Sequence, residues 1–95
     1  MTTTMRIINS TTGEIWERET KGLVSALIIR FIYDVIDDDN YTEDAFDDLV
    51  NRASDTMEKI DWAAPNEPCC AGITVAITNY KYDRYETYRI EAERE

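Results

Sequence analysis

The 95-residue sequence contains no histidine, and glycine, proline and cysteine are scarce. Histidine is a frequent general base and the commonest metal ligand in proteins, so its absence removes the simplest route to both roles. No glycine-rich phosphate loop occurs, and no serine or cysteine has an evident base beside it. The sequence therefore predicts a protein that is not an enzyme and that has no cofactor or metal site.

Two further absences concern disulfides and membranes. The two cysteines, Cys69 and Cys70, are adjacent, so a bond between them is strained and their thiolates alone do not complete a zinc site. We expect both thiols to be reduced and partly buried. No apolar run approaches the roughly 20 residues that span a bilayer, and the opening MTTTM lacks the basic and then apolar character of a signal peptide. We expect a cytoplasmic protein.

Basic residues are also rare in the middle of the chain. Residues 31–67 contain twelve acidic and two basic side chains, a balance of −10, whereas the remaining residues contain eight of each. Such a field repels DNA, RNA and anionic membranes, and it attracts a basic protein or a cation. The predicted partner is therefore a basic protein, with no direct contact to nucleic acid or membrane.

Length and patterning predict a single α+β domain over residues 1–95. The expected segments are a flexible end at 1–4, a hairpin at 4–19, a helical pair at 20–60, a loop at 61–72 and a hairpin at 73–93. This ββααββ order predicts a two-layer sandwich, in which two antiparallel helices cover one face of an antiparallel sheet.

Alternation and helical spacing underlie these segments. The stretches ITVAITN and YRIEA alternate apolar and polar residues, as half-buried strands do. In the second helix, apolar residues recur at intervals of three and four behind an N-cap at Thr42. The first helix, with an N-cap at Thr20, extends to residue 39 and is apolar on most sides. That pattern predicts burial by a sheet, a helix or a second copy of the chain.

The stretch DVIDDDNYTEDAFDDLV holds eight carboxylates and no base. These carboxylates belong to Asp34, Asp37, Asp38, Asp39, Glu43, Asp44, Asp47 and Asp48. We expect Asp37, Asp38 and Asp39 at the C-terminal end of the first helix, where the helix dipole disfavours each anion by a few tenths to about 1 kcal/mol. The spacing also gives like-charge pairs four residues apart, Asp34–Asp38, Glu43–Asp47 and Asp44–Asp48. Glu43 and Asp44 gain from a place in the first turn of the second helix, and Asp48 can pair with Arg52. As a group, however, the acids from 34 to 47 oppose local stability, so we predict that the eight residues bind a partner.

A calcium loop is one explanation for this stretch. The pattern DDDNYTEDAFDD places Asp37 and Asp39 at the first and third positions, but Thr42 stands where a glycine is required and Asp48 where a glutamate is. The sequence therefore does not predict an EF-hand. A divalent-metal-dependent enzyme that uses the same carboxylates is a remote alternative.

Charge mimicry is the second explanation. One DNA strand carries a phosphate about every 3.4 Å. Eight carboxylates over ~20 Å, at a helical rise of about 1.5 Å per residue, reach a comparable density. Such a patch can occupy the groove of a nucleic-acid-binding protein. Tyr80, Tyr82 and Tyr85, near the last predicted turn, are candidates for a second contact because tyrosine is enriched at interfaces, although cross-strand packing is the alternative.

In length, acidity and α+β character, with its charge concentrated between Asp34 and Glu67, the chain resembles the small inhibitor proteins of phages and mobile elements. Anti-CRISPR and anti-restriction proteins are the examples. The resemblance implies a non-enzymatic inhibitor, in the host cytoplasm, that binds a CRISPR effector or restriction complex through the acids of residues 34–48 and blocks access to DNA. The alternative is a homodimeric structural or regulatory protein, whose first helix forms the interface and whose acids only maintain solubility.

Overall fold

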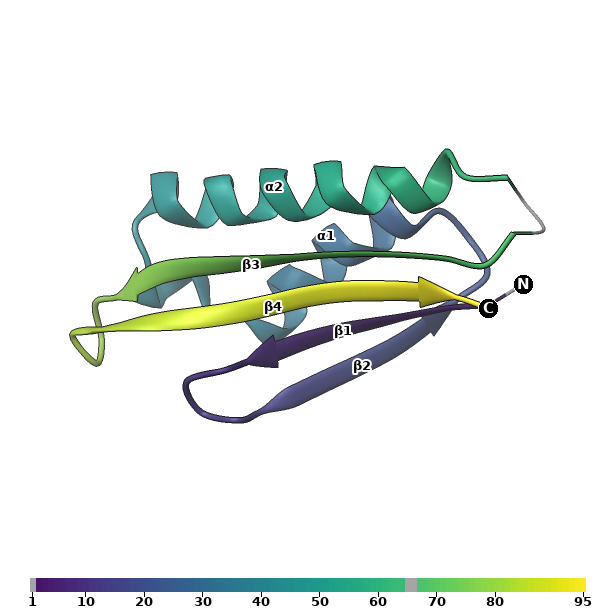
Figure 1. Ribbon diagram of the computed structural model, residues 1–95. Coiled ribbons are helices and arrows are strands. Elements are labelled where there is room, and N and C mark those ends of the chain that lie inside the picture. The colour runs from purple at the N-terminus through teal and green to yellow at the C-terminus, as the bar shows by residue number, and fades with distance from the viewer. Residues whose placement is uncertain (1, 65–66) are drawn as a thin grey trace.

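The structure is a computed structural model that describes residues 2–64 and 67–95. Figure 1 shows two helices on one side of an antiparallel sheet. In chain order, the elements are β1 (Thr3–Asn9), β2 (Ile15–Thr20), α1 (Val24–Val35), the short 3₁₀ helix η1 (Asp38–Asn40), α2 (Glu43–Asp61), β3 (Cys69–Asn79) and β4 (Arg84–Arg94). Over the described ranges, no helix is long and apolar enough to cross a membrane.

The sheet has the strand order β2-β1-β4-β3, and every neighbouring pair is antiparallel. Hairpins join β1 to β2 and β3 to β4, and the first and last strands of the chain pair at the centre. The predicted α+β class, the ββααββ order and the two-layer layout are confirmed. Strands β2 and β3 form the two edges of the sheet.

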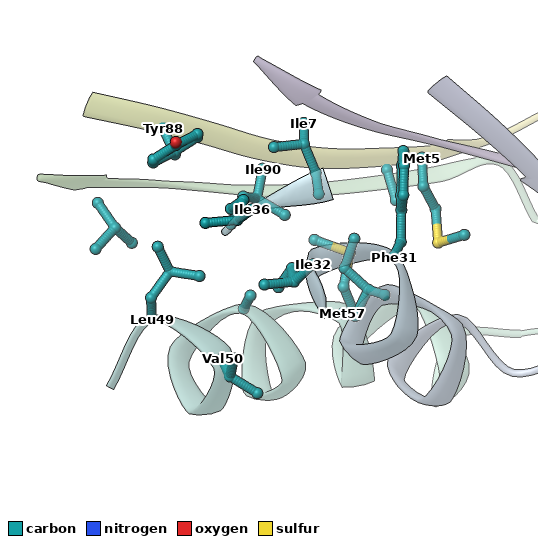
Figure 2. Close-up of a cluster of buried hydrophobic side chains, with 14 of the residues drawn as sticks. Met5, Ile7, Phe31, Ile32, Ile36, Leu49, Val50, Met57, Tyr88 and Ile90 are labelled. Atoms are coloured by element: carbon teal, nitrogen blue, oxygen red, sulfur yellow. The ribbon is translucent and has the colours of Figure 1, made fainter. Parts of the chain in front are cut away.

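Alternation along the strands separates the two faces of the sheet. On β1 and β4 every second side chain is buried, and these inward residues form the core together with apolar residues of α1 and α2. Figure 2 shows this packing, with side chains of the helices and the sheet meeting between the two layers. The fully buried large side chains include Met5, Ile7, Ile28, Phe31, Ile32, Leu49, Met57, Ile60 and Ile90.

Both hairpin turns are held by a buried asparagine at the end of a strand. Asn9 accepts hydrogen bonds at Oδ1 from the amides of Thr11 and Thr12, and Asn79 accepts two at Oδ1 from the amides of Lys81 and Tyr82. Such side-chain acceptors replace backbone partners that a tight turn leaves unpaired. Gly13, with φ of 83°, closes the first turn in a conformation that favours glycine.

The first helix is shorter than its sequence predicts. α1 begins at Val24 and ends at Val35, so the predicted N-cap at Thr20 is wrong; Thr20 ends β2, and its Oγ accepts a hydrogen bond from the amide of Gly22. The N-cap position is Leu23, which has no side-chain acceptor. Asp61, at the end of α2, caps α1 instead, because its carboxylate accepts hydrogen bonds from the amides of Val24 and Ser25 at 2.7 and 3.1 Å.

Two other predicted boundaries are wrong. Strand β3 begins at Cys69, so residues 69–72 belong to the sheet and not to a loop, because each of them pairs with a residue of β4. At the other end, residues 3 and 4 are not a flexible tail, since β1 begins at Thr3 and both residues pair with β2 and with β4. Residue 1 and residues 65–66 lie outside the described residues. The two cysteines are free thiols, half-buried at Cys69 and exposed at Cys70.

Candidate acidic binding site

The predicted acidic residues lie at one end of the molecule, where the chain passes from α1 to α2. The connection contains η1, whose N-cap Asp37 accepts a hydrogen bond from the amide of Asp39 at 3.1 Å. Helix α2 then begins with the predicted cap, because Thr42 accepts one from the amide of Ala45 at 3.3 Å. All eight predicted acidic side chains are exposed, and four of them, Asp38, Asp39, Glu43 and Asp47, line one hollow.

The local energetics of the first four acids differ from the prediction. Helix α1 ends at Val35, with Ile36 as its C-cap, so Asp37, Asp38 and Asp39 do not lie in its last turn. They form a separate turn in which Asp37 is a stabilising cap. Asp34 and Asp38 are therefore not a helical pair, whereas Glu43–Asp47 and Asp44–Asp48 do lie one turn apart in α2.

Ion pairs divide the acidic stretch into held and unpaired carboxylates. Asp34 pairs with Arg18 of β2 at 2.9 Å, and Asp48 pairs with Arg52 one turn further along α2 at 3.8 Å. The other six acids of the stretch form no ion pair with any residue of the described chain, and Asp37 has its capping role. Five acids have no side-chain partner that holds them: Asp38, Asp39, Glu43, Asp44 and Asp47. Of these, Glu43 and Asp44 gain some stability from the helix dipole, because they lie in the first turn of α2.

Four of these five surround an open hollow with an aromatic floor. The hollow has a volume of about 440 Å³ and is lined by Tyr33, Asp38, Asp39, Tyr41, Glu43, Phe46 and Asp47. The rings of Tyr33 and Phe46 meet edge to face, with their centroids 5.2 Å apart, and Tyr33 is half-exposed. Aromatic faces attract cations, and carboxylates attract them more strongly. The combination therefore suits a lysine or arginine side chain.

A buried polar cluster connects this surface to the sheet. Tyr41, which directly follows η1, donates a hydrogen bond from its hydroxyl to Glu86 of β4 at 2.6 Å. Tyr88 donates to the same carboxylate at 3.2 Å, and Arg84 forms a 2.9 Å ion pair with its other oxygen. Glu86 and Tyr88 are 3% and 4% exposed, so these hydrogen bonds fix the connection between α1 and α2 to buried residues of β4.

The same contacts shift the pKa values of the cluster. Burial by itself raises the pKa of Glu86, but hydrogen bonds from Tyr41, Arg84, Asn79 and Tyr88 outweigh burial and hold that pKa below its ordinary value. Burial, followed by the hydrogen bond to Glu86, raises the pKa of Tyr41 well above its ordinary value. Burial raises the pKa of Tyr88 to about 12. Glu86 is therefore an anion and both tyrosines are neutral donors at neutral pH.

The predicted tyrosines separate into two groups. The amide of Tyr80 donates a hydrogen bond to the carbonyl of Asn40 in η1 at 2.8 Å, so the β3–β4 turn lies against the acidic connection, as Figure 1 shows at its left end. Tyr82 lines a second hollow together with Asp37, and both Tyr80 and Tyr82 are exposed. Tyr85 is exposed on the sheet face opposite the helices, since its neighbour Glu86 points inward. The structure therefore brings Tyr80 and Tyr82 next to the acids, but not Tyr85.

Several residues of this end could not be assigned from the sequence. Glu86 occupies an inward position of β4, in register with the buried Tyr88 and Ile90, and a charge at such a position was the one available signal. Tyr33 and Tyr41 gave no comparable signal because their partners, Phe46 and Glu86, are distant in sequence. Asp37, Asp38 and Asp39 have carboxylate oxygens within 4.8 Å of one another, which is close enough to hold a divalent cation, and all three are exposed.

The fold and this surface define a small α+β protein with an acidic, aromatic-floored site at the connection between its helices. No protein family, no curated protein and no solved structure matches the chain. Its function has to be inferred from the chemistry of the surface.

Proposed function

We propose that the protein is a non-enzymatic inhibitor that binds a basic, nucleic-acid-binding protein through the acidic end and blocks that protein's access to DNA. The target class is a CRISPR effector, a restriction complex or a similar nuclease assembly, as the resemblance in size, charge and fold class implies. The observation that supports the proposal most directly is the hollow in which unpaired carboxylates surround Tyr33 and Phe46. The tyrosines of the β3–β4 turn extend the same contact.

The spacing of the carboxylates favours a target that normally binds phosphates. Glu43 and Asp47, like Asp44 and Asp48, are one turn apart in α2, about 6 Å along the helix axis. These two pairs, together with the acids of η1, offer negative charge at a density comparable to that of one DNA strand, which carries a phosphate about every 3.4 Å. A lysine- or arginine-lined channel that holds DNA can therefore accept this surface.

Rigidity also supports an inhibitory role. A mobile acidic loop loses conformational entropy when it binds, whereas a preformed surface loses little. Here Tyr41 is hydrogen-bonded to buried Glu86, and Asn40 accepts a hydrogen bond from Tyr80, so the acids are carried by a turn that is fixed at two points.

The test uses a charge-neutralised variant and a control with the same net charge. The variant carries Asp38→Asn, Asp39→Asn, Glu43→Gln and Asp47→Asn, which removes the charges around the hollow. The control carries Glu19→Gln, Asp55→Asn, Glu58→Gln and Glu93→Gln, all at exposed positions outside the hollow. Each protein is used to capture partners from a lysate that contains CRISPR and restriction systems, at ~0.1 M and ~0.5 M salt, because screening weakens exposed ionic contacts over that range.

A captured protein is then purified, and its affinity for labelled DNA is measured with each variant added. We expect the wild-type protein and the control to displace the DNA at low salt and the hollow variant to fail. If the hollow variant displaces DNA as well as the control does, the acidic hollow is not the binding site. If the captured protein binds DNA unimpeded by wild type, the inhibitory function is wrong.

A further inference from the structure

The two edges of the sheet differ in how well they are protected against pairing with another strand. Edge strand β2 has six residues, and Glu17, Arg18 and Glu19 supply charges that discourage a further strand. Edge strand β3 has eleven residues and no charge at all, and residues 68–80 form the longest uncharged stretch of a chain in which 32% of residues are charged. A long, neutral, β-branched edge is the kind that adds another strand.

The outer backbone of β3 has no partner in the described part of the chain. β3 pairs with β4 on one side only, and its amides and carbonyls form no further hydrogen bond with residues 2–64 or 67–95. Every second residue of an edge strand points its amide and carbonyl away from the sheet, so a regular row of donors and acceptors is open. The side chains on the face opposite the helices are small and leave this row accessible: Cys70, Gly72, Thr74, Ala76 and Thr78.

We propose that β3 pairs with β3 of a second copy of this chain, antiparallel, about a two-fold axis at Thr74. The two four-stranded sheets then form one continuous sheet. In this register Thr74 lies opposite Thr74, Ile73 opposite Val75 and Gly72 opposite Ala76. Because opposed residues keep the same face, both helical layers lie on one side of the joined sheet.

A second copy suits this edge better than a basic partner does. Every cross-strand pair in the proposed register is neutral, and the apolar residues of the helix-facing side meet apolar residues. A lysine- or arginine-rich strand would find no carboxylate along β3. Helix α1 is a poorer dimer surface, because its apolar residues Val24, Ile28, Phe31 and Ile32 are already buried in the chain's own core.

This dimer is independent of the acidic site and responds to salt in the opposite direction. Two molecules of charge −10 repel each other, so screening should strengthen β3 pairing. Contact between the acidic end and a basic protein should instead weaken with salt. One set of measurements at two salt concentrations can therefore test dimerisation and binding of the basic partner independently.

The experiment is sedimentation velocity of the full chain at protein concentrations from ~1 to ~300 μM, at ~0.1 M and ~0.5 M salt. We expect a dimer that becomes tighter at the higher salt. Thr74→Asp places two like charges directly opposite each other at the axis and should weaken the dimer roughly tenfold or more. Within the monomer the new carboxylate lies beside Arg89, whose Nη1 is 3.4 Å from the Thr74 hydroxyl, so the fold should be retained.

Thr87→Asp is the matched control, because Thr87 lies on the same face in the inner strand β4, opposite Ala76. It should dimerise as the wild type does. A wild type that stays monomeric throughout, or a Thr74→Asp variant as dimeric as the control, would overturn the proposal.

A second measurement does not depend on a destabilising change. In a Cys69→Ala, Cys70→Ser background, Thr74→Cys should form an intermolecular disulfide on mild oxidation, since opposed residues of paired strands lie within bonding distance. Ala76→Cys in the same background should not, because Gly72 stands opposite it. Equal cross-linking of the two variants would contradict the register, and no cross-linking of Thr74→Cys would contradict the pairing.

Discussion

Two kinds of carboxylate lie at the same end of this molecule. Glu86 is 3% exposed and accepts hydrogen bonds from two tyrosines and Arg84, whereas Asp38, Asp39 and Asp47 are exposed and unpaired in the described chain. The first kind holds the acidic connection to the sheet, and the second kind faces outward from that connection. The difference indicates that net charge is a poor guide to the role of a given acid, because burial and hydrogen bonding separate structural acids from those available to a partner.

Removal of Glu86 should have the largest effect on stability. Glu86→Ala removes the shared acceptor of the Tyr41 and Tyr88 hydroxyls, which lie 2.9 Å apart, so one can donate to the other but one buried donor is left unpaired. We expect a loss of about 2–3 kcal/mol in the free energy of unfolding. Urea denaturation followed by circular dichroism measures this loss. The control is Glu91→Ala, since Glu91 is about one-third exposed and pairs with Arg6 and Arg89, so its loss should stay below about 1 kcal/mol. Equal losses in the two variants would mean that the buried cluster contributes no more to stability than the partly exposed ion pairs of Glu91.

The protonation of Glu86 should have a smaller effect, visible in acid. Its folded-state pKa lies below the ordinary value, so its charge stabilises the fold above the ordinary glutamate pKa of about 4.3, and this stability is lost as the pH falls through the folded-state pKa. Unfolding measured from pH 7 downward should therefore show wild type losing more stability than Glu86→Gln below about pH 4.5. Parallel curves for the two proteins would contradict the depressed pKa.

Substitutions of two acids of the η1 turn should have the next largest effects on stability, and these effects should differ. Asp37→Ala removes the cap that accepts from the Asp39 amide, and we expect a loss of about 0.5–1 kcal/mol. Asp39→Ala removes an exposed, unpaired charge, and its stability should stay within about 0.5 kcal/mol of wild type. Thermal unfolding of the two variants side by side tests the division. If Asp39→Ala is the more damaging, the assignment of the cap is wrong.

Much of this fold could be predicted because its local signals agree with its packing. The alternation in ITVAITN and YRIEA, the spacing of apolar residues in α2 and the cap at Thr42 all depend on neighbours in sequence. The start of α1 could not be predicted, because Asp61, which caps it, is 37 residues from Val24. Similarly, Tyr41 and Glu86 are 45 residues apart, so neither sequence neighbourhood indicates the hydrogen bond that fixes the acidic connection.

The candidate site was predicted in composition but not in shape. Counting charges located all eight exposed acids, yet it did not distinguish Asp37, which caps a turn, from Asp38, which has no such contact. Nor did it reveal that Tyr33 and Phe46 form a floor between the carboxylates. Those distinctions arise from the end of α1 at Val35, which no residue pattern marks, since the apolar run continues through Ile36.

Neutralisation of an acid in α2 should have the smallest effect, with the opposite sign. Glu43 and Asp47 are like charges one turn apart, so Asp47→Asn should raise the free energy of unfolding by about 0.2–0.5 kcal/mol at low salt. The gain should shrink at ~0.5 M salt because screening already reduces the repulsion. Asp48→Asn is the control, since it relieves Asp44 but also loses the pair with Arg52, and its net effect should be close to zero. If Asp47→Asn lowers the stability, Asp47 belongs to the structural acids. If it raises the stability and also weakens capture of the basic partner, Asp47 is an acid retained for binding.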